Sequence, residues 1–176
     1  MLENIWRKIM KVLFLDFDGV LNSAASFLWE KRKKTVYIAG TLSPINCSNL
    51  QYILENDSSI KIVISSTWRK IHTMVELQNI LNSYGVEAAR IIGKTPVLFS
   101  GHRGREIRQW LDENPNVTQY VILDDDSDAL GALNLWSEGQ EEPTADPKGH
   151  FFQTTWDDGL SLSTAIKVKK LFRGEK

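Results

Sequence analysis

Three groups of acidic or hydroxyl side chains each directly follow a short apolar run. Asp16-Phe17-Asp18-Gly19 follows residues 12–15, Ser65-Ser66-Thr67 follows residues 60–64, and Asp124-Asp125-Asp126 follows residues 120–123. Runs as continuously apolar as these are typical of strands buried on both faces of a sheet. Because open α/β sheets bind ligands at the carboxyl ends of their strands, we expect the three groups to meet in one crevice.

The acidic groups predict a site for a divalent cation. Asp16 and Asp18 are two residues apart, so on extended backbone their side chains point the same way, and Gly19 lets the chain turn sharply beside them. Closely packed carboxylates repel one another unless a cation lies among them, and Mg²⁺ prefers such oxygen ligands. One carboxylate can then act as a nucleophile and another can transfer a proton. Aspartates are also common turn residues, but three groups at three strand ends favour the cation site.

The segments between the apolar runs predict helices. Helical patterns begin at or near Ser43, Met74, Ile107 and Leu162. The first opens with Ser43-Pro44, an N-cap followed by proline, and Gly85 lies just beyond the end of the second. Weaker strand patterns cover residues 86–92 and 150–154. Strands that alternate with helices predict an α/β fold, in which a mainly parallel sheet lies between helical layers.

The composition excludes several classes of protein. The chain has 176 residues, 42% of them hydrophobic, and a net charge of −1, so we expect one globular domain that does not coat nucleic acid by bulk charge. No apolar run approaches the roughly 20 residues of a membrane helix, so no membrane partner is expected. The charged N-terminal stretch without a small-residue cleavage site predicts no signal peptide. The single cysteine, Cys47, fits a reducing, cytoplasmic setting.

The motifs resemble those of the HAD (haloacid dehalogenase-like) phosphohydrolases. Residues 16–21, Asp-Phe-Asp-Gly-Val-Leu, are similar to the first motif, Ser65 to the second, and Asp124-Asp125 to the fourth. The third motif, a Lys or Arg that opens the helix before that strand, falls within residues 101–107. The stretches 65–69, 103–107 and 159–161 resemble the phosphatase modules of multidomain RNA-repair ("Swiss army knife") proteins.

This resemblance implies a three-layer, Rossmann-like HAD fold without a large cap domain. It also implies that residues 1–10 are an N-terminal extension and that residues 11–176 form a single HAD-like phosphatase domain. The segment 22–42 is too short to hold a large cap, and an open site suits a macromolecular substrate better than a small metabolite.

The resemblance also implies roles for the acidic residues. Asp16 would attack phosphorus and form an aspartyl-phosphate, while Asp18 would protonate the leaving oxygen and then activate water. Mg²⁺ would be held by Asp16, by the backbone carbonyl of Asp18 and by Asp124. Either Asp125 or Asp128 would support the ion.

A second set of residues would bind the phosphoryl group. Ser65 would donate a hydrogen bond to it, and Arg103 would neutralise its developing charge near a helix N-terminus. Arg105 competes with Arg103 for that role, and Ser66 and Arg69 complete the predicted substrate contacts. Trp68, between Thr67 and Arg69, either faces the substrate or belongs to the core.

Together these features predict a hydrolase: a Mg²⁺-dependent phosphomonoesterase that removes a terminal phosphate from RNA or DNA, as in nucleic acid repair. One alternative is a small-molecule or nucleotide phosphatase with the same mechanism, and another is a non-catalytic phosphoacceptor similar to a response-regulator receiver. The basic run at residues 31–34, flanked by Trp29 and Tyr37, is either a grip on a nucleic acid end or a solvated loop. The oligomeric state stays open.

Overall fold

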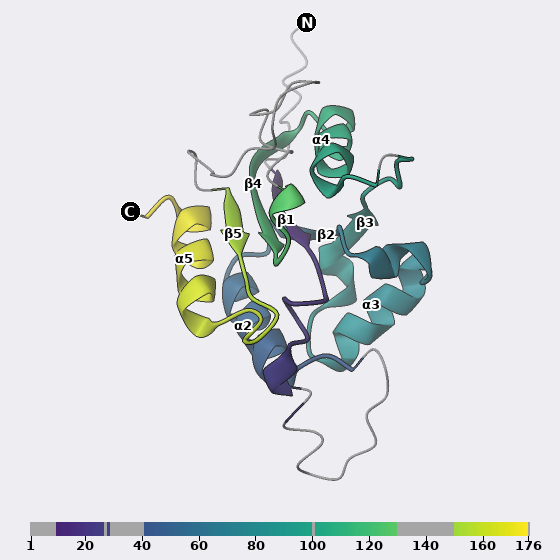
Figure 1. The fold of residues 1–176 in the computed structure, drawn as a ribbon. Coiled ribbons are helices and arrows are strands. Elements are labelled where there is room, and N and C mark those ends of the chain that lie inside the picture. Colours follow the sequence, from purple (N-terminus) through teal and green to yellow (C-terminus); the bar gives the residue numbers. More distant parts are fainter. Residues whose placement is uncertain (1–9, 27, 29–40, 100, 130–149, 176) are drawn as a thin grey trace, which may run out of the picture.

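The computed structural model describes residues 10–26, 28, 41–99, 101–129 and 150–175. Five strands form one sheet in the order β3-β2-β1-β4-β5, and every neighbouring pair is parallel. The strands are β1 (Met10–Leu15), β2 (Ile60–Ile64), β3 (Ile91–Lys94), β4 (Val117–Asp124) and β5 (Phe151–Gln153). The strands that precede the three groups of polar side chains, β1, β2 and β4, are therefore the three central ones (Figure 1).

Helices connect the strands, as the alternating pattern predicts. They are α2 (Pro44–Leu54), α3 (Met74–Ser83), α4 (Arg103–Glu113) and α5 (Leu162–Arg173), with the short 3₁₀ helices η1 (Thr67–Lys70) and η2 (Ala88–Arg90). The predicted N-cap is confirmed, since the Ser43 hydroxyl accepts a hydrogen bond from the backbone N–H of Asn46 at 3.3 Å. No helix among the described residues is long and apolar enough to cross a membrane.

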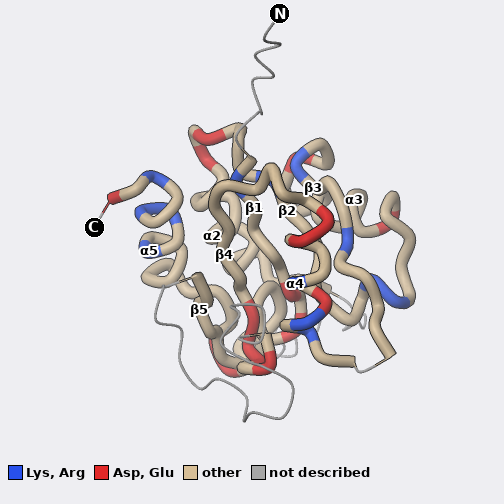
Figure 2. Tube along the Cα trace, turned by 90° about the horizontal axis from the view of Figure 1, so that it is seen from above, with Lys and Arg blue, Asp and Glu red and all other residues tan. Residues whose placement is uncertain are grey.

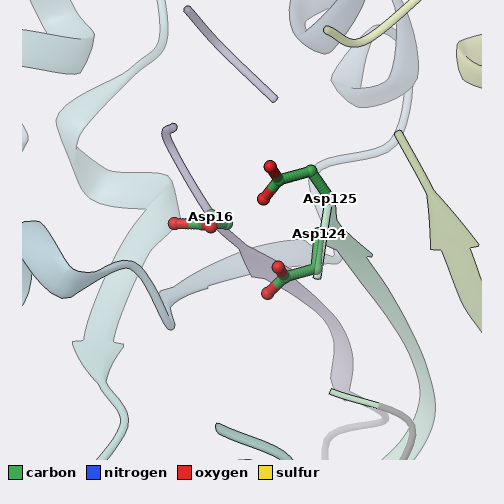
Figure 3. Close-up of side chains that lie close together, drawn as sticks. All are labelled: Asp16, Asp124 and Asp125. Atoms are coloured by element: carbon green, nitrogen blue, oxygen red, sulfur yellow. The ribbon is translucent and has the colours of Figure 1, made fainter. Parts of the chain in front are cut away.

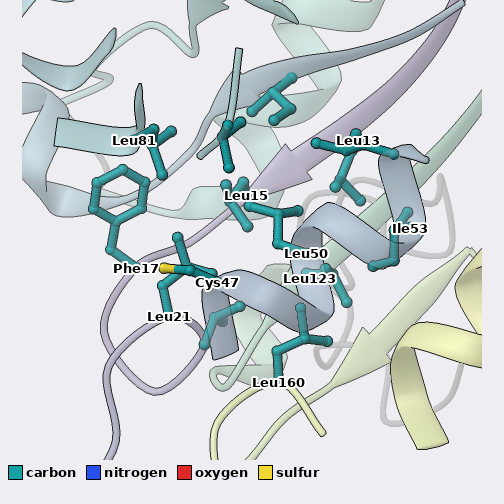
Figure 4. Packing of buried hydrophobic residues seen from close by; sticks show 14 of the residues in the cluster. Leu13, Leu15, Phe17, Leu21, Cys47, Leu50, Ile53, Leu81, Leu123 and Leu160 are labelled. Carbon is teal, nitrogen blue, oxygen red and sulfur yellow. The ribbon is translucent and has the colours of Figure 1, made fainter. Parts of the chain in front are cut away.

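The core lies on both faces of the sheet. Alternate β1 side chains point to opposite faces, so Leu13 and Leu15 pack with α2, α3 and α5, while Val12 and Phe14 pack with α4. Figure 4 shows the larger cluster, in which Leu50 of α2 lies close to the β1 leucines. The predicted α/β architecture with helices on both faces of the sheet is confirmed.

Two details differ from the predicted elements. The strand expected at residues 86–92 begins only at Ile91, because residues 88–90 turn as η2 and Val86 is buried in the core just after α3. Met10, placed in the extension, is the first residue of β1. The extension up to residue 9 and the basic run with Trp29 and Tyr37 lie outside the described residues.

Candidate active site

The register of the sheet places three functional groups at one level. The backbone N–H of Asp16 donates to Leu123 O, and the backbone N–H of Ser65 donates to Leu15 O, each at 3.0 Å. The ladder therefore continues one residue beyond β1 and β2. Asp16 is thus held between Ser65 on one side and Asp124 on the other, as expected for parallel strands that end together.

Three carboxylates meet at this edge of the sheet. Asp16, Asp124 and Asp125 each offer one oxygen, and these oxygens lie within 4.8 Å of one another (Figure 3). Ligands at about 2.1 Å from Mg²⁺ are at most about 4.2 Å apart, so this oxygen-only set is close to the span that the ion needs. Asp16 and Asp124 are buried, with 3% and 0% of their surface exposed. The donor set therefore fits magnesium. The further ligand role of the Asp18 backbone carbonyl stays a prediction.

Arg103 supplies the positive charge within this cluster. Its Nη1 lies 2.5 Å from Asp16 Oδ2 and 2.6 Å from Asp124 Oδ2, and it opens α4, as the third motif requires. Burial disfavours the charged guanidinium, but the carboxylates of Asp124 and Asp16 outweigh burial and raise the pKa of Arg103 above its usual range. Acidic and basic segments lie side by side near α4 in Figure 2. Of the two competing arginines, Arg103 therefore contacts the acidic cluster, while Arg105 is the third residue of α4.

One guanidinium serves two buried carboxylates, and this imbalance favours a proton on one of them. Burial and the neighbouring Asp16 carboxylate raise the pKa of Asp124 to about 8, although Arg103 acts in the opposite direction. Burial, and then Asp16, also raise the pKa of Asp125. A divalent cation would oppose both shifts, because it would compensate the negative charge of the neighbouring carboxylates.

The structure separates the two aspartates that competed to support the metal. Asp125 belongs to the carboxylate cluster and packs so closely on Gly19 that a Cβ there would lie 2.4 Å from Asp125 Cγ. Gly19 also has φ +70°, in the left-handed region that favours glycine. Asp128 instead accepts a hydrogen bond at 3.1 Å from the backbone N–H of Arg103. It thereby ties the segment after β4 to the first residue of α4.

Asp18 is held apart from the cluster by two donors. Its Oδ1 accepts a hydrogen bond at 2.8 Å from the side-chain amide of Asn22, and its Oδ2 accepts one at 3.0 Å from the indole N–H of Trp68. Each carboxylate oxygen keeps a further lone pair, so Asp18 can gain or lose a proton while both bonds persist. This arrangement suits a group that transfers protons.

The two serines after β2 have different surroundings. Ser65 is fully buried, and its Oγ has no hydrogen-bond partner among the described residues. A buried hydroxyl without a partner costs about 1–3 kcal/mol, which indicates that it serves a group that arrives at the site. Ser66 is equally buried, but its Oγ accepts a hydrogen bond at 3.3 Å from the backbone N–H of Trp68 and caps η1.

Arg69 donates to groups of the protein itself, whereas the sequence predicts that it contacts the substrate. Its five N–H groups all donate within the protein, to the backbone oxygens of Ser65, Ser66, Thr95 and Pro96 and to the carboxylate of Glu106. Only 4% of Arg69 is exposed. No N–H is left for a phosphate, so we correct its assignment: Arg69 joins the ends of β2 and β3 to α4.

Three contributors to the site were missed or left open by sequence reasoning. Asn22 and Glu106 were missed, and the role of Trp68 was undecided. Asn22 lies four residues after Asp18, a spacing that would have pointed to a side-chain bond within the turn. Glu106 could not be found in this way, because its partner Arg69 is 37 residues away in sequence.

Comparisons with known proteins agree with this geometry. A family model described as the HAD domain in Swiss Army Knife RNA repair proteins matches residues 12–165. Among solved structures, the crystal structure of the Legionella pneumophila effector Ceg4 matches with a TM-score of 0.51 and 13% identity, over 93% of this chain and 95% of that chain. That likeness concerns the fold alone, and no curated protein matches. The family model spans most of the chain and all the motifs described above, so the chain belongs to the family of HAD domains found in Swiss Army Knife RNA repair proteins.

Proposed function

We propose that this protein is a Mg²⁺-dependent phosphomonoesterase that works through an aspartyl-phosphate intermediate. Membership of the HAD family supports a HAD-type phosphatase. The observation that supports the proposal most is the buried Ser65 Oγ, which has no partner among the described residues and follows the strand next to Asp16. A phosphoryl group bound at Asp16 would give this hydroxyl an acceptor.

The residues of the site divide the reaction into two steps. In the first, a carboxylate oxygen of Asp16 forms a bond to phosphorus while the bond from phosphorus to the ester oxygen breaks, and Asp18 gives its proton to that oxygen. In the second, Asp18 takes a proton from water, whose oxygen attacks phosphorus, and the Asp16–phosphate bond breaks to release inorganic phosphate. Ser65 and Arg103 would donate hydrogen bonds to the phosphoryl oxygens, where negative charge develops.

A magnesium ion held by Asp16, Asp124 and Asp125 would offset the charge of these carboxylates and of the incoming phosphate. Arg103, which contacts two of them, already serves part of this need. The same carboxylates, without a cation, would repel a phosphate dianion. We therefore expect turnover to depend on the divalent ion.

The proposed substrate is a terminal phosphate on RNA or DNA. The description of the matching family, which names RNA repair proteins, supports this choice over a small phosphate ester. A nucleotide or another small phosphate ester is the alternative substrate for the same chemistry.

The test is phosphate release from 3′- and 5′-phosphorylated oligonucleotides, a mononucleotide and an aryl phosphate, each with magnesium and with EDTA. Magnesium-dependent release that favours one oligonucleotide end is the expected result, and Asp16→Asn should abolish it while the protein stays folded. Release only from the mononucleotide or the aryl phosphate would replace the proposed substrate by a small ester. Full activity of Asp16→Asn would refute the mechanism, and a stable aspartyl-phosphate without turnover would favour the receiver-like alternative.

A further inference from the structure

Trp68 connects two segments of the site that come from different strands. It lies on η1, directly after β2, and its indole N–H donates to Asp18 Oδ2, which belongs to the turn after β1, at 3.0 Å. The other donor to Asp18, Asn22, belongs to the same turn, where its side-chain oxygen also accepts from the backbone N–H of Gly19 at 3.2 Å. Of these two donors, only Trp68 therefore fixes the Asp18 carboxylate relative to the rest of the sheet.

The Trp68 side chain is itself held firmly. Only 9% of Trp68 is exposed, and its ring packs edge-on against Phe17 with a centroid distance of 5.0 Å. The 3₁₀ helix that presents it is tied down at its end, because Lys94 Nζ donates to the backbone oxygens of Arg69 and His72, each at 3.0 Å. An indole that packs only as core would not need its N–H directed at a carboxylate. Trp68 can therefore fix the direction of the Asp18 carboxylate as well as fill space.

We propose that Trp68 is a positioning residue for proton transfer: its indole N–H orients the Asp18 carboxylate toward the ester oxygen. This inference rests on the proposed function, because it assigns Asp18 to the proton transfer in that reaction. It resolves the choice that the sequence left open, since Trp68 is both part of the core and part of the catalytic arrangement.

The consequence can be measured because only some leaving groups need a proton. An alkoxide is a poor leaving group, so release of an alkyl ester or a nucleic acid end depends on a well-placed general acid. A dinitrophenolate leaves as an anion without that help. Loss of the Trp68 N–H should therefore slow phosphoryl transfer to Asp16 from the first class of substrate and leave transfer from the second nearly unchanged, whereas a general loosening of the site would slow both.

The chain offers a matched control in Trp110. Like Trp68, Trp110 is 9% exposed and packs edge-on against an aromatic residue, here Phe14 of β1, with a centroid distance of 5.5 Å. Its indole N–H has no carboxylate partner among the described residues, so Trp110→Phe reports the general effect of losing an indole from this core. Thermal unfolding of both variants checks that they are folded at the assay temperature.

The experiment compares kcat and KM of the wild type, Trp68→Phe and Trp110→Phe on an alkyl phosphate and on 2,4-dinitrophenyl phosphate with magnesium. We expect Trp68→Phe to lower kcat/KM, which reports the transfer of the phosphoryl group to Asp16, about tenfold or more on the alkyl ester and less than about threefold on the dinitrophenyl ester. The attack of water on the aspartyl-phosphate is common to both esters, so any effect of the variant on that step lowers kcat on both. If Trp68→Phe does not fold, benzothienylalanine at position 68 replaces the N–H by sulfur and keeps the ring shape. We expect the same selective loss from it.

The outcomes separate this inference from the function on which it rests. An equal loss of kcat/KM on both esters, or no loss beyond that of Trp110→Phe, overturns the role of Trp68 and leaves the phosphatase intact. A wild-type chain that releases phosphate from neither ester overturns both. In an Asp18→Asn background the selective effect of Trp68→Phe should vanish, and its persistence would show that Trp68 does not act through Asp18.

Discussion

Ser65→Ala should leave the fold intact or stabilise it while impairing catalysis. The fully buried Ser65 Oγ has no hydrogen-bond partner among the described residues, so its removal breaks no bond there and relieves an unpaired buried hydroxyl. Since such a group costs about 1–3 kcal/mol, and part of the gain is lost with the packing of the oxygen, we expect the free energy of unfolding to rise by about 0–1 kcal/mol. For a chain of this length that corresponds to a Tm increase of at most about 2–4 °C.

The effect on turnover should have the opposite sign. If Ser65 donates to a phosphoryl oxygen on which charge develops, its loss removes one fixed donor, which is typically worth about 10²–10³-fold in kcat. The assay is steady-state phosphate release with magnesium, together with thermal unfolding of the same preparations. The combination of a higher or equal Tm with a fall in kcat is the expected signature.

Ser66→Ala is the matched control for this prediction. The two serines are adjacent and equally buried, but Ser66 Oγ caps η1 by accepting a hydrogen bond from the backbone N–H of Trp68. Its loss should destabilise the protein by about 1 kcal/mol. A Ser65→Ala variant that loses as much stability as Ser66→Ala, or that keeps wild-type kcat, would refute the assignment of Ser65 to the phosphoryl group.

Two further predictions follow from the buried charges. Glu106→Gln should cost about 3–5 kcal/mol of unfolding free energy, because it leaves the Arg69 guanidinium buried without its counter-charge. Denaturant unfolding measures this cost, and the control is Asp112→Asn, which removes an exposed carboxylate paired with Arg108 on the same helix. A cost of Glu106→Gln no larger than that of the control would contradict the prediction. The pKa of Asp124 is raised to about 8, so the folded protein keeps a proton on Asp124 that the unfolded chain loses above about pH 4. The free energy of unfolding of the metal-free protein should therefore fall as the pH rises from about 4 to about 8. Because Mg²⁺ must displace that proton, the Tm increase on adding magnesium should be larger at pH 8.5 than at pH 6.5, and equal increases would contradict the pKa shift.

The sequence predicts those parts of the site that depend on strand ends and on local caps. A continuous apolar run predicts a buried strand, and the acid or hydroxyl that follows it marks the carboxyl end of that strand. The sequence therefore places Asp16, Ser65 and Asp124 at one edge of the sheet without any knowledge of their contacts. The choice of Arg103 over Arg105 followed from helix position in the same way. In the structure Arg103 opens α4 and contacts both Asp16 and Asp124.

Contacts between segments far apart in sequence could not be predicted in this manner. Arg69 follows the second motif directly, so a substrate contact was the natural expectation. Its position within η1 directs the guanidinium into the protein, toward the backbone oxygens of Thr95 and Pro96 after β3 and toward Glu106. Apolar periodicity carries no information on such a pairing. The Trp68–Asp18 bond escaped for the same reason, since 50 residues separate its partners.

The contrast between Arg69 and Ser65 shows where this fold tolerates unpaired groups. Arg69 satisfies every N–H it has, and four of its five acceptors are backbone oxygens at the ends of β2 and β3. Beside these filled contacts, the hydroxyls of Ser65 and Thr95, which follow the same two strands, are buried without partners among the described residues. The hydrogen bonds of Arg69 to backbone oxygens hold the strand ends rigid, while the unpaired buried hydroxyls lower the stability of the protein. Such rigidity is useful where a hydroxyl must meet a phosphoryl oxygen at hydrogen-bond distance without rearrangement.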